Sequence, residues 1–85
     1  MFSGLNYITY EGGTGETAVI FDPNIPHARM AEVMDSQNGG VVILGAGKVS
    51  AVAANGLIHC YGEAKSLNIT SRGIDDESVI KNLKF

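Results

Sequence analysis

One short segment concentrates the side chains with the most chemistry. Residues 59–66 read HCYGEAKS and include Cys60, the only cysteine of the chain, together with Lys65 and Ser66. A thiolate is a nucleophile and a soft ligand, and neighbouring cations such as Lys65 and Arg72 lower the pKa of a thiol. Cys60 is therefore a candidate ligand-carrying residue. The alternative is a buried, unreactive cysteine, which is common in proteins.

The same segment predicts neither a catalytic dyad nor a metal centre. His59 and Cys60 are neighbours, and neighbours in a strand point to opposite faces. One cysteine and two histidines are too few for a typical metal site, so no metal and no cofactor is expected. Ser66, with Lys65, Arg72 and nearby amides, could instead bind a small anion. A solvated edge strand is the alternative interpretation of these polar residues.

His27 is the second candidate for chemistry. It follows Pro26, which suits the first turn of a helix. Free N–H groups and the helix dipole favour an anion at that position. A histidine there could act as nucleophile or general acid towards a bound phosphate. Alternatively, His27 extends the apolar face of the helix.

The glycines of the segment LGAGKVS do not form a phosphate-binding loop. The Walker motif requires a further glycine at the position of Val42, and a serine or threonine at the position of Val49. Gly45 and Gly47 instead predict a β-bulge or a close approach of two backbones.

Alternation of apolar residues and turn signals predict a single α+β domain over residues 1–85. The helix after Pro26 would connect two strands by a right-handed crossover. We expect a mixed sheet of four to five strands with one or two helices packed on one face. In chain order, the predicted elements are a hairpin at 3–22, a helix at 27–36, a strand at 40–47, a hairpin at 48–62 turning at Asn55-Gly56, a strand or loop at 63–73, and a helix at 76–83.

Each predicted helix has an expected buried face. In the first, helical spacing places four residues on one stripe. In the second, Asp75 or Asp76 is expected to cap the N-terminus. The stripe of the first helix comprises His27, Met30, Ala31 and Met34, and the buried side of the second comprises Val79, Ile80 and Leu83.

Composition restricts the class of function. Six Lys plus Arg face nine Asp plus Glu, and the net charge of −3 argues against nucleic-acid binding. Apolar residues make up 45% of this short chain, an excess that either a subunit interface or an apolar ligand pocket would use. Because so small a domain has little interior to hollow out, we expect a homo-oligomer. A lone cysteine forms no internal disulfide, and we find no signal peptide and no membrane span, so a cytoplasmic location is expected.

The run HARMAEVM, followed by VVILGAGKVSAVAANGLIHCYGEAKS, resembles the Janus/phosphohistidine phosphatase family over about residues 26–66. The resemblance implies a catalytic His27 and a phosphate held by amides and by a serine after Tyr-Gly. That serine corresponds to Ala64 here, with Ser66 two residues later, and residues 1–28 contain no Lys or Arg to complete a basic pocket. The matching positions are His27-Ala28, Leu44-Gly45-Ala46-Gly47, Ile58, Tyr61 and Gly62.

In its size and lone cysteine the chain is also similar to the small archaeal selenium-binding proteins. That resemblance implies a homo-oligomer with a functional Cys60 and a selenium-type or small anionic ligand. We therefore predict a cytoplasmic homo-oligomeric binding or carrier protein without turnover, which carries its ligand at Cys60. The alternative is a phosphohistidine phosphatase-like enzyme that uses His27.

Overall fold

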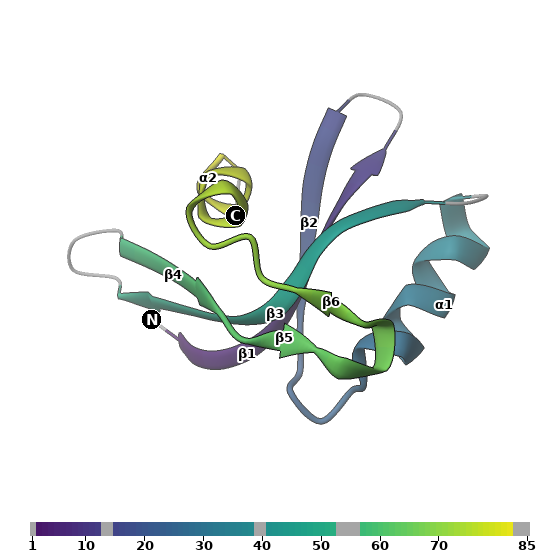
Figure 1. The fold of residues 1–85 in the computed structure, drawn as a ribbon, viewed down its shortest axis with the longest axis horizontal. Coiled ribbons are helices and arrows are strands. Elements are labelled where there is room, and N and C mark those ends of the chain that lie inside the picture. Colours follow the sequence, from purple (N-terminus) through teal and green to yellow (C-terminus); the bar gives the residue numbers. More distant parts are fainter. Residues whose placement is uncertain (1, 13–14, 39–40, 53–56, 83–85) are drawn as a thin grey trace.

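Four antiparallel strands form the main sheet of the computed structural model, which describes residues 2–12, 15–38, 41–52 and 57–82 (Figure 1). The strands are β1 (Phe2–Gly12), β2 (Gly15–Phe21), β3 (Val42–Val52) and β4 (Leu57–Tyr61). They lie in the order β2-β1-β3-β4, so the two long strands β1 and β3 are central and the shorter strands form the two edges.

The crossover expected between the second and third strands is present, but the expected mixed sheet is wrong. Helix α1 (His27–Asn38) connects β2 to β3, and these two strands run in the same direction. They do not pair, because β1 lies between them and is antiparallel to both. Every described pair in the main sheet is therefore antiparallel.

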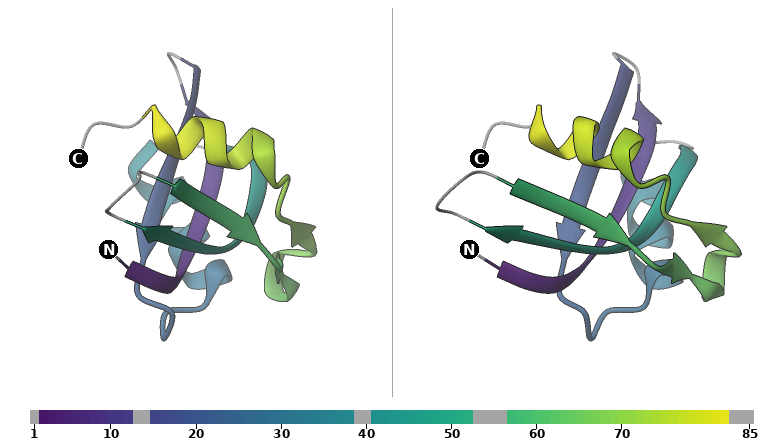
Figure 2. Two further views of the ribbon diagram at one scale, coloured as in Figure 1. Left: turned by 90° about the vertical axis from the view of Figure 1, so that its left-hand side faces the viewer. Right: turned by 60° about the vertical axis from the view of Figure 1, so that its left-hand side comes forward.

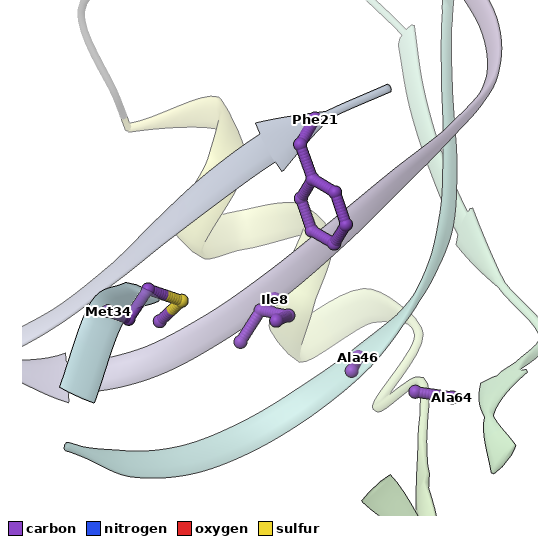
Figure 3. Close-up of a cluster of buried hydrophobic side chains, with 5 residues drawn as sticks. All are labelled: Ile8, Phe21, Met34, Ala46 and Ala64. Atoms are coloured by element: carbon purple, nitrogen blue, oxygen red, sulfur yellow. The ribbon is translucent and has the colours of Figure 1, made fainter. Parts of the chain in front are cut away.

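The two helices pack on opposite faces of the sheet, which corrects the expectation of helices on one face (Figure 1). Successive strand residues point to opposite faces, so one strand supplies side chains to both. Ile8 packs with Met34 of α1, and the neighbouring Tyr7 packs with Ile80 of helix α2 (Ile74–Lys81). In Figure 3 the side chains of Ile8 and Met34 lie on one side of the sheet, with α2 behind it.

Both glycines singled out in β3 have the structural roles predicted for them. Thr9 pairs with Gly45 and Tyr10 with Ile43, so one residue of β3 bulges between these pairs. At Gly47 the chain leaving β4 crosses closely, and a Cβ at that glycine would lie 2.4 Å from the carbonyl oxygen of Tyr61. The prediction of a bulge and a close backbone approach is confirmed.

The segment between β4 and α2 forms a small second sheet (Figure 2). Strands β5 (Glu63–Ala64) and β6 (Ile69–Thr70) pair around a 3₁₀ turn, η1 (Lys65–Leu67). Asn68 closes this turn in the left-handed conformation, with φ 55°. The regular alternation expected of an edge strand is therefore interrupted within the segment.

Both predicted helices are present. Of the stripe predicted on α1, His27 and Met34 are buried, whereas Met30 and Ala31 are half-buried. The capping prediction for α2 is wrong: its N-cap is Gly73, and Asp76 is buried against the sheet instead. The predicted turn at Asn55-Gly56 lies outside the described residues, as does Leu83. Within the described ranges, neither helix has the length and apolar character needed to cross a membrane.

Candidate functional site

A fully buried carboxylate, Asp76, is the most connected polar group between α2 and the sheet. The hydroxyl of Tyr7 donates a hydrogen bond to Asp76 Oδ2, and the hydroxyl of Thr9 donates one to Asp76 Oδ1 over 2.7 Å. Arg72 donates twice, from its backbone N–H to Oδ2 (2.8 Å) and from Nε to Oδ1 (2.7 Å). The Oγ atom of Ser71 lies 2.7 Å from the Tyr7 hydroxyl and extends the network.

These contacts decide the charge state of the network. Burial alone would raise the pKa of Asp76, but the hydrogen bonds from Tyr7, Thr9 and Arg72 outweigh it and hold the pKa below its ordinary value. Burial, together with the adjacent carboxylate, raises the pKa of Tyr7. Asp76 is thus ionised and Tyr7 neutral near pH 7. Because Asp76 has no exposed surface, a substrate cannot contact it, and the network holds α2 against the sheet.

Cys60 lies on the same sheet face, packed with Tyr7 and Ile80, and is 3% exposed. Burial raises the pKa of its thiol to about 12, and the charges of Asp76 and Glu77 add to that effect. The backbone N–H of Cys60 donates to Glu77 Oε2 over 3.0 Å, so α2 also holds the main chain of β4. The site offers a protonated thiol under a helix, which is the opposite of the environment that activates a cysteine.

His27 occupies the first residue of α1, as expected, but its ring points into the protein. Its Nε2 atom lies 2.9 Å from the carbonyl oxygen of Gly47, so that nitrogen carries the proton and donates it. The ring also meets Phe21 edge-on, with 5.4 Å between ring centroids. His27 fastens the start of α1 to β3 through this hydrogen bond.

The three polar residues proposed for an anion site contact different elements. Ser66 lies in η1 at the N-terminus of α1, where the Ala28 N–H donates to its Oγ over 3.3 Å. Lys65 is exposed in the same turn. Arg72 is engaged elsewhere, by Asp76 and by Glu16 at 2.9 Å. The fold therefore brings Ser66 near His27, whereas Arg72 is neutralised by two carboxylates.

Large apolar side chains remain exposed along α2 and β4. Ile74 is 80% exposed and Leu57 is 62% exposed. They line a groove of about 290 Å³ between the two elements, which we call the α2–β4 groove. Its lining residues are Leu57, Ile58, Ile74, Glu77, Ser78 and Lys81.

Comparison with known proteins adds no family to this description. No family model matches the chain, and neither a curated protein nor a solved structure matches it. The resemblances to the Janus phosphatases and to the selenium-binding proteins therefore stay predictions. Among the described residues, no group of three or more His, Cys, Asp or Glu side chains is placed to hold a metal ion.

The sequence interpretation missed the Asp76 network, although one signal for it was present. Tyr7 and Thr9 are two hydroxyl residues on one face of β1, and both are fully buried. Buried hydroxyls need hydrogen-bond partners. In α2, Asp76 precedes the apolar Ile80 by one helical turn, so both point to the same face.

Proposed function

We propose that the chain is a small cytoplasmic homo-oligomeric binding or carrier protein without turnover. The observation that carries the proposal is the apolar α2–β4 groove with Leu57 and Ile74 exposed beside it. Large exposed apolar residues grouped at one place mark interaction surfaces. By contrast, His27 and Cys60 are buried and engaged in internal contacts. The single cysteine supports a reducing compartment.

The occupant that we propose for the α2–β4 groove is a second copy of the chain. A two-fold interface uses the same patch on both subunits, so the patch must complement itself. The groove contains apolar side chains together with one acid, Glu77, and one base, Lys81. When two α2 helices cross antiparallel, Glu77 of each subunit approaches Lys81 of the other, and the apolar residues meet between them.

Light scattering after size exclusion tests this proposal. At micromolar concentration we expect at least twice the 8.9 kDa mass of one chain. Leu57→Lys should shift the protein to monomer, because the charge would be buried in the interface. Val42→Lys is the matched control, since Val42 is also 62% exposed but does not line the groove. A wild-type monomer, or equal effects of the two variants, would contradict the proposal.

Two finer predictions stay open beside this one. A ligand carried at Cys60 requires α2 to move away, since the helix and the sheet enclose the thiol. A phosphatase requires His27 to leave the Gly47 carbonyl. The one contact in favour of the phosphatase is the position of Ser66 at the N-terminus of α1.

A further inference from the structure

A second groove, of about 390 Å³, lies between α1 and β3, on the sheet face opposite to α2. Figure 1 shows α1 and α2 well separated on the two sides of the central strands. We call this hollow the α1–β3 groove. Its lining residues are Ala28, Ala31, Glu32, Asp35, Val41, Ile43 and Leu67.

The α1–β3 groove has an apolar floor and an acidic rim. Its four α1 residues follow the spacing of one helical stripe, next to the buried stripe that contains Met34. Ala28 and Ala31 form the half of this stripe near the start of α1, and their small side chains let another backbone approach closely. Glu32 and Asp35 form the other half. None of the described residues that line this groove is basic.

The charges of α1 are opposite to those that would stabilise a helix. Acids are favourable in the first turn of a helix and bases in the last, because of the helix dipole. Here the first turn contains Arg29 and no acid, and the last turn contains Asp35 and no base. Glu32 makes a 3.9 Å contact with Arg29 between two exposed side chains, and Asp35 has no ion pair among the described residues. The negative end of the helix dipole and the carboxylates of Glu32 and Asp35 therefore all make the electrostatic potential at the α1–β3 groove more negative.

We infer that the α1–β3 groove docks a basic amphipathic segment of a partner polypeptide. Its apolar side chains would pack on Val41, Ile43 and Leu67, and its Lys or Arg side chains would pair with Glu32 and Asp35. This inference rests on the proposed binding function and names the class of partner. It uses a surface separate from the α2–β4 groove, so a bound partner and a second subunit do not compete.

Neither described helix of a second copy of the chain supplies such a segment. Arg29 is the one Lys or Arg of α1, and Lys81 is the one Lys or Arg of α2. Neither helix therefore presents the row of bases that two carboxylates and a negative helix end would attract. Charge complementarity thus favours a different polypeptide.

The probe for this inference is a fluorescein-labelled synthetic helix of leucines, at positions i, i+3, i+4 and i+7, and lysines. Its control replaces each lysine by glutamate. Fluorescence anisotropy should show that the lysine peptide binds and that the glutamate peptide does not. Added salt should weaken the binding of the lysine peptide. The double variant Glu32→Gln/Asp35→Asn should lose tenfold or more in affinity. The matched control Glu63→Gln/Asp75→Asn removes two exposed carboxylates away from this groove and should stay within twofold.

A third variant separates binding from folding. Asp35→Lys should raise the melting temperature, because a base suits the last turn of α1, and should still abolish peptide binding. Equal losses in both double variants would show only general attraction to an acidic protein and would overturn the inference. So would an absence of binding by the wild type. Light scattering on the same samples reports self-association separately, so the two proposals fail independently.

Discussion

The carboxylate of Asp76 lies directly over the Cα of Gly45, in the space that a side chain of β3 would fill. A Cβ at Gly45 would lie 2.3 Å from Asp76 Oδ2. Asp76 cannot move aside easily, because Thr9 and Arg72 hold the same carboxylate. The glycine is thus required by a residue that follows it by 31 positions in the chain.

Gly45→Ala should therefore destabilise the protein by about 1–3 kcal/mol, the usual cost of overpacking a buried site. Gly12→Ala is the matched control, since a Cβ there would make an ordinary contact, 3.7 Å from the ring of Tyr10. Urea denaturation followed by circular dichroism measures both. Equal stabilities of the two variants would mean that Asp76 does not restrict this position.

Acid should weaken the attachment of α2 to the sheet. The folded state holds the pKa of Asp76 below the ordinary value, so the unfolded chain binds a proton more readily. The stabilisation from Asp76 is therefore fully present above the unfolded pKa of about 4, and it is lost as the pH falls towards the folded value. We expect the melting temperature to decrease below about pH 5.

In Thr9→Val, which removes one donor to the carboxylate of Asp76, the free energy of unfolding at pH 7 should fall by about 1.5–3 kcal/mol.

The thiol of Cys60 should react with Ellman's reagent at pH 8 about 10³-fold more slowly than an exposed cysteine, because burial raises its pKa to about 12. Denaturant should restore the normal rate. Selenite or electrophile labelling of the native protein tests the carrier role directly. Rapid labelling of the native wild type, absent in Cys60→Ser, would show that α2 opens and would favour the carrier.

Replacing His27 should affect stability before it affects any reaction. His27→Ala removes a buried ring and leaves the Gly47 carbonyl without its donor, at a cost of about 2–5 kcal/mol. A phosphohistidine peptide assay with wild type and His27→Ala tests the phosphatase alternative, and we expect equal background rates. A loss of 10²-fold or more in a variant that remains folded would instead indicate a catalytic histidine.

Local signals in the sequence predicted the helix that begins at His27 and the roles of Gly45 and Gly47. These features depend on neighbours in the chain: a proline before a helix, and glycines within a strand. The arrangement of the helices was not predictable in the same way. Two acids at the start of a helix indicate a cap, and only the packing of α2 on Tyr7 and Thr9 shows that Asp76 is buried.

The same packing buries Cys60, which its neighbours in the sequence made a candidate reactive thiol. Exposure depends on which segments return over the strand, and α2 follows β4 only after the small second sheet. Likewise, Arg72 is close to Cys60 in the sequence, but its guanidinium forms an ion pair with Glu16 on β2. Pairings between distant elements decided each of these outcomes.

The bond from the Cys60 N–H to Glu77 has a further effect on how the protein behaves at high concentration. An open edge strand offers unpaired N–H groups to the strands of other molecules, and such edges nucleate fibrils. β4 is an edge strand, and the carboxylate of Glu77 occupies one of its donors and places a negative charge beside it. We therefore expect Glu77→Ala, which frees this N–H and removes the charge, to shorten the lag before the protein forms thioflavin-positive aggregates.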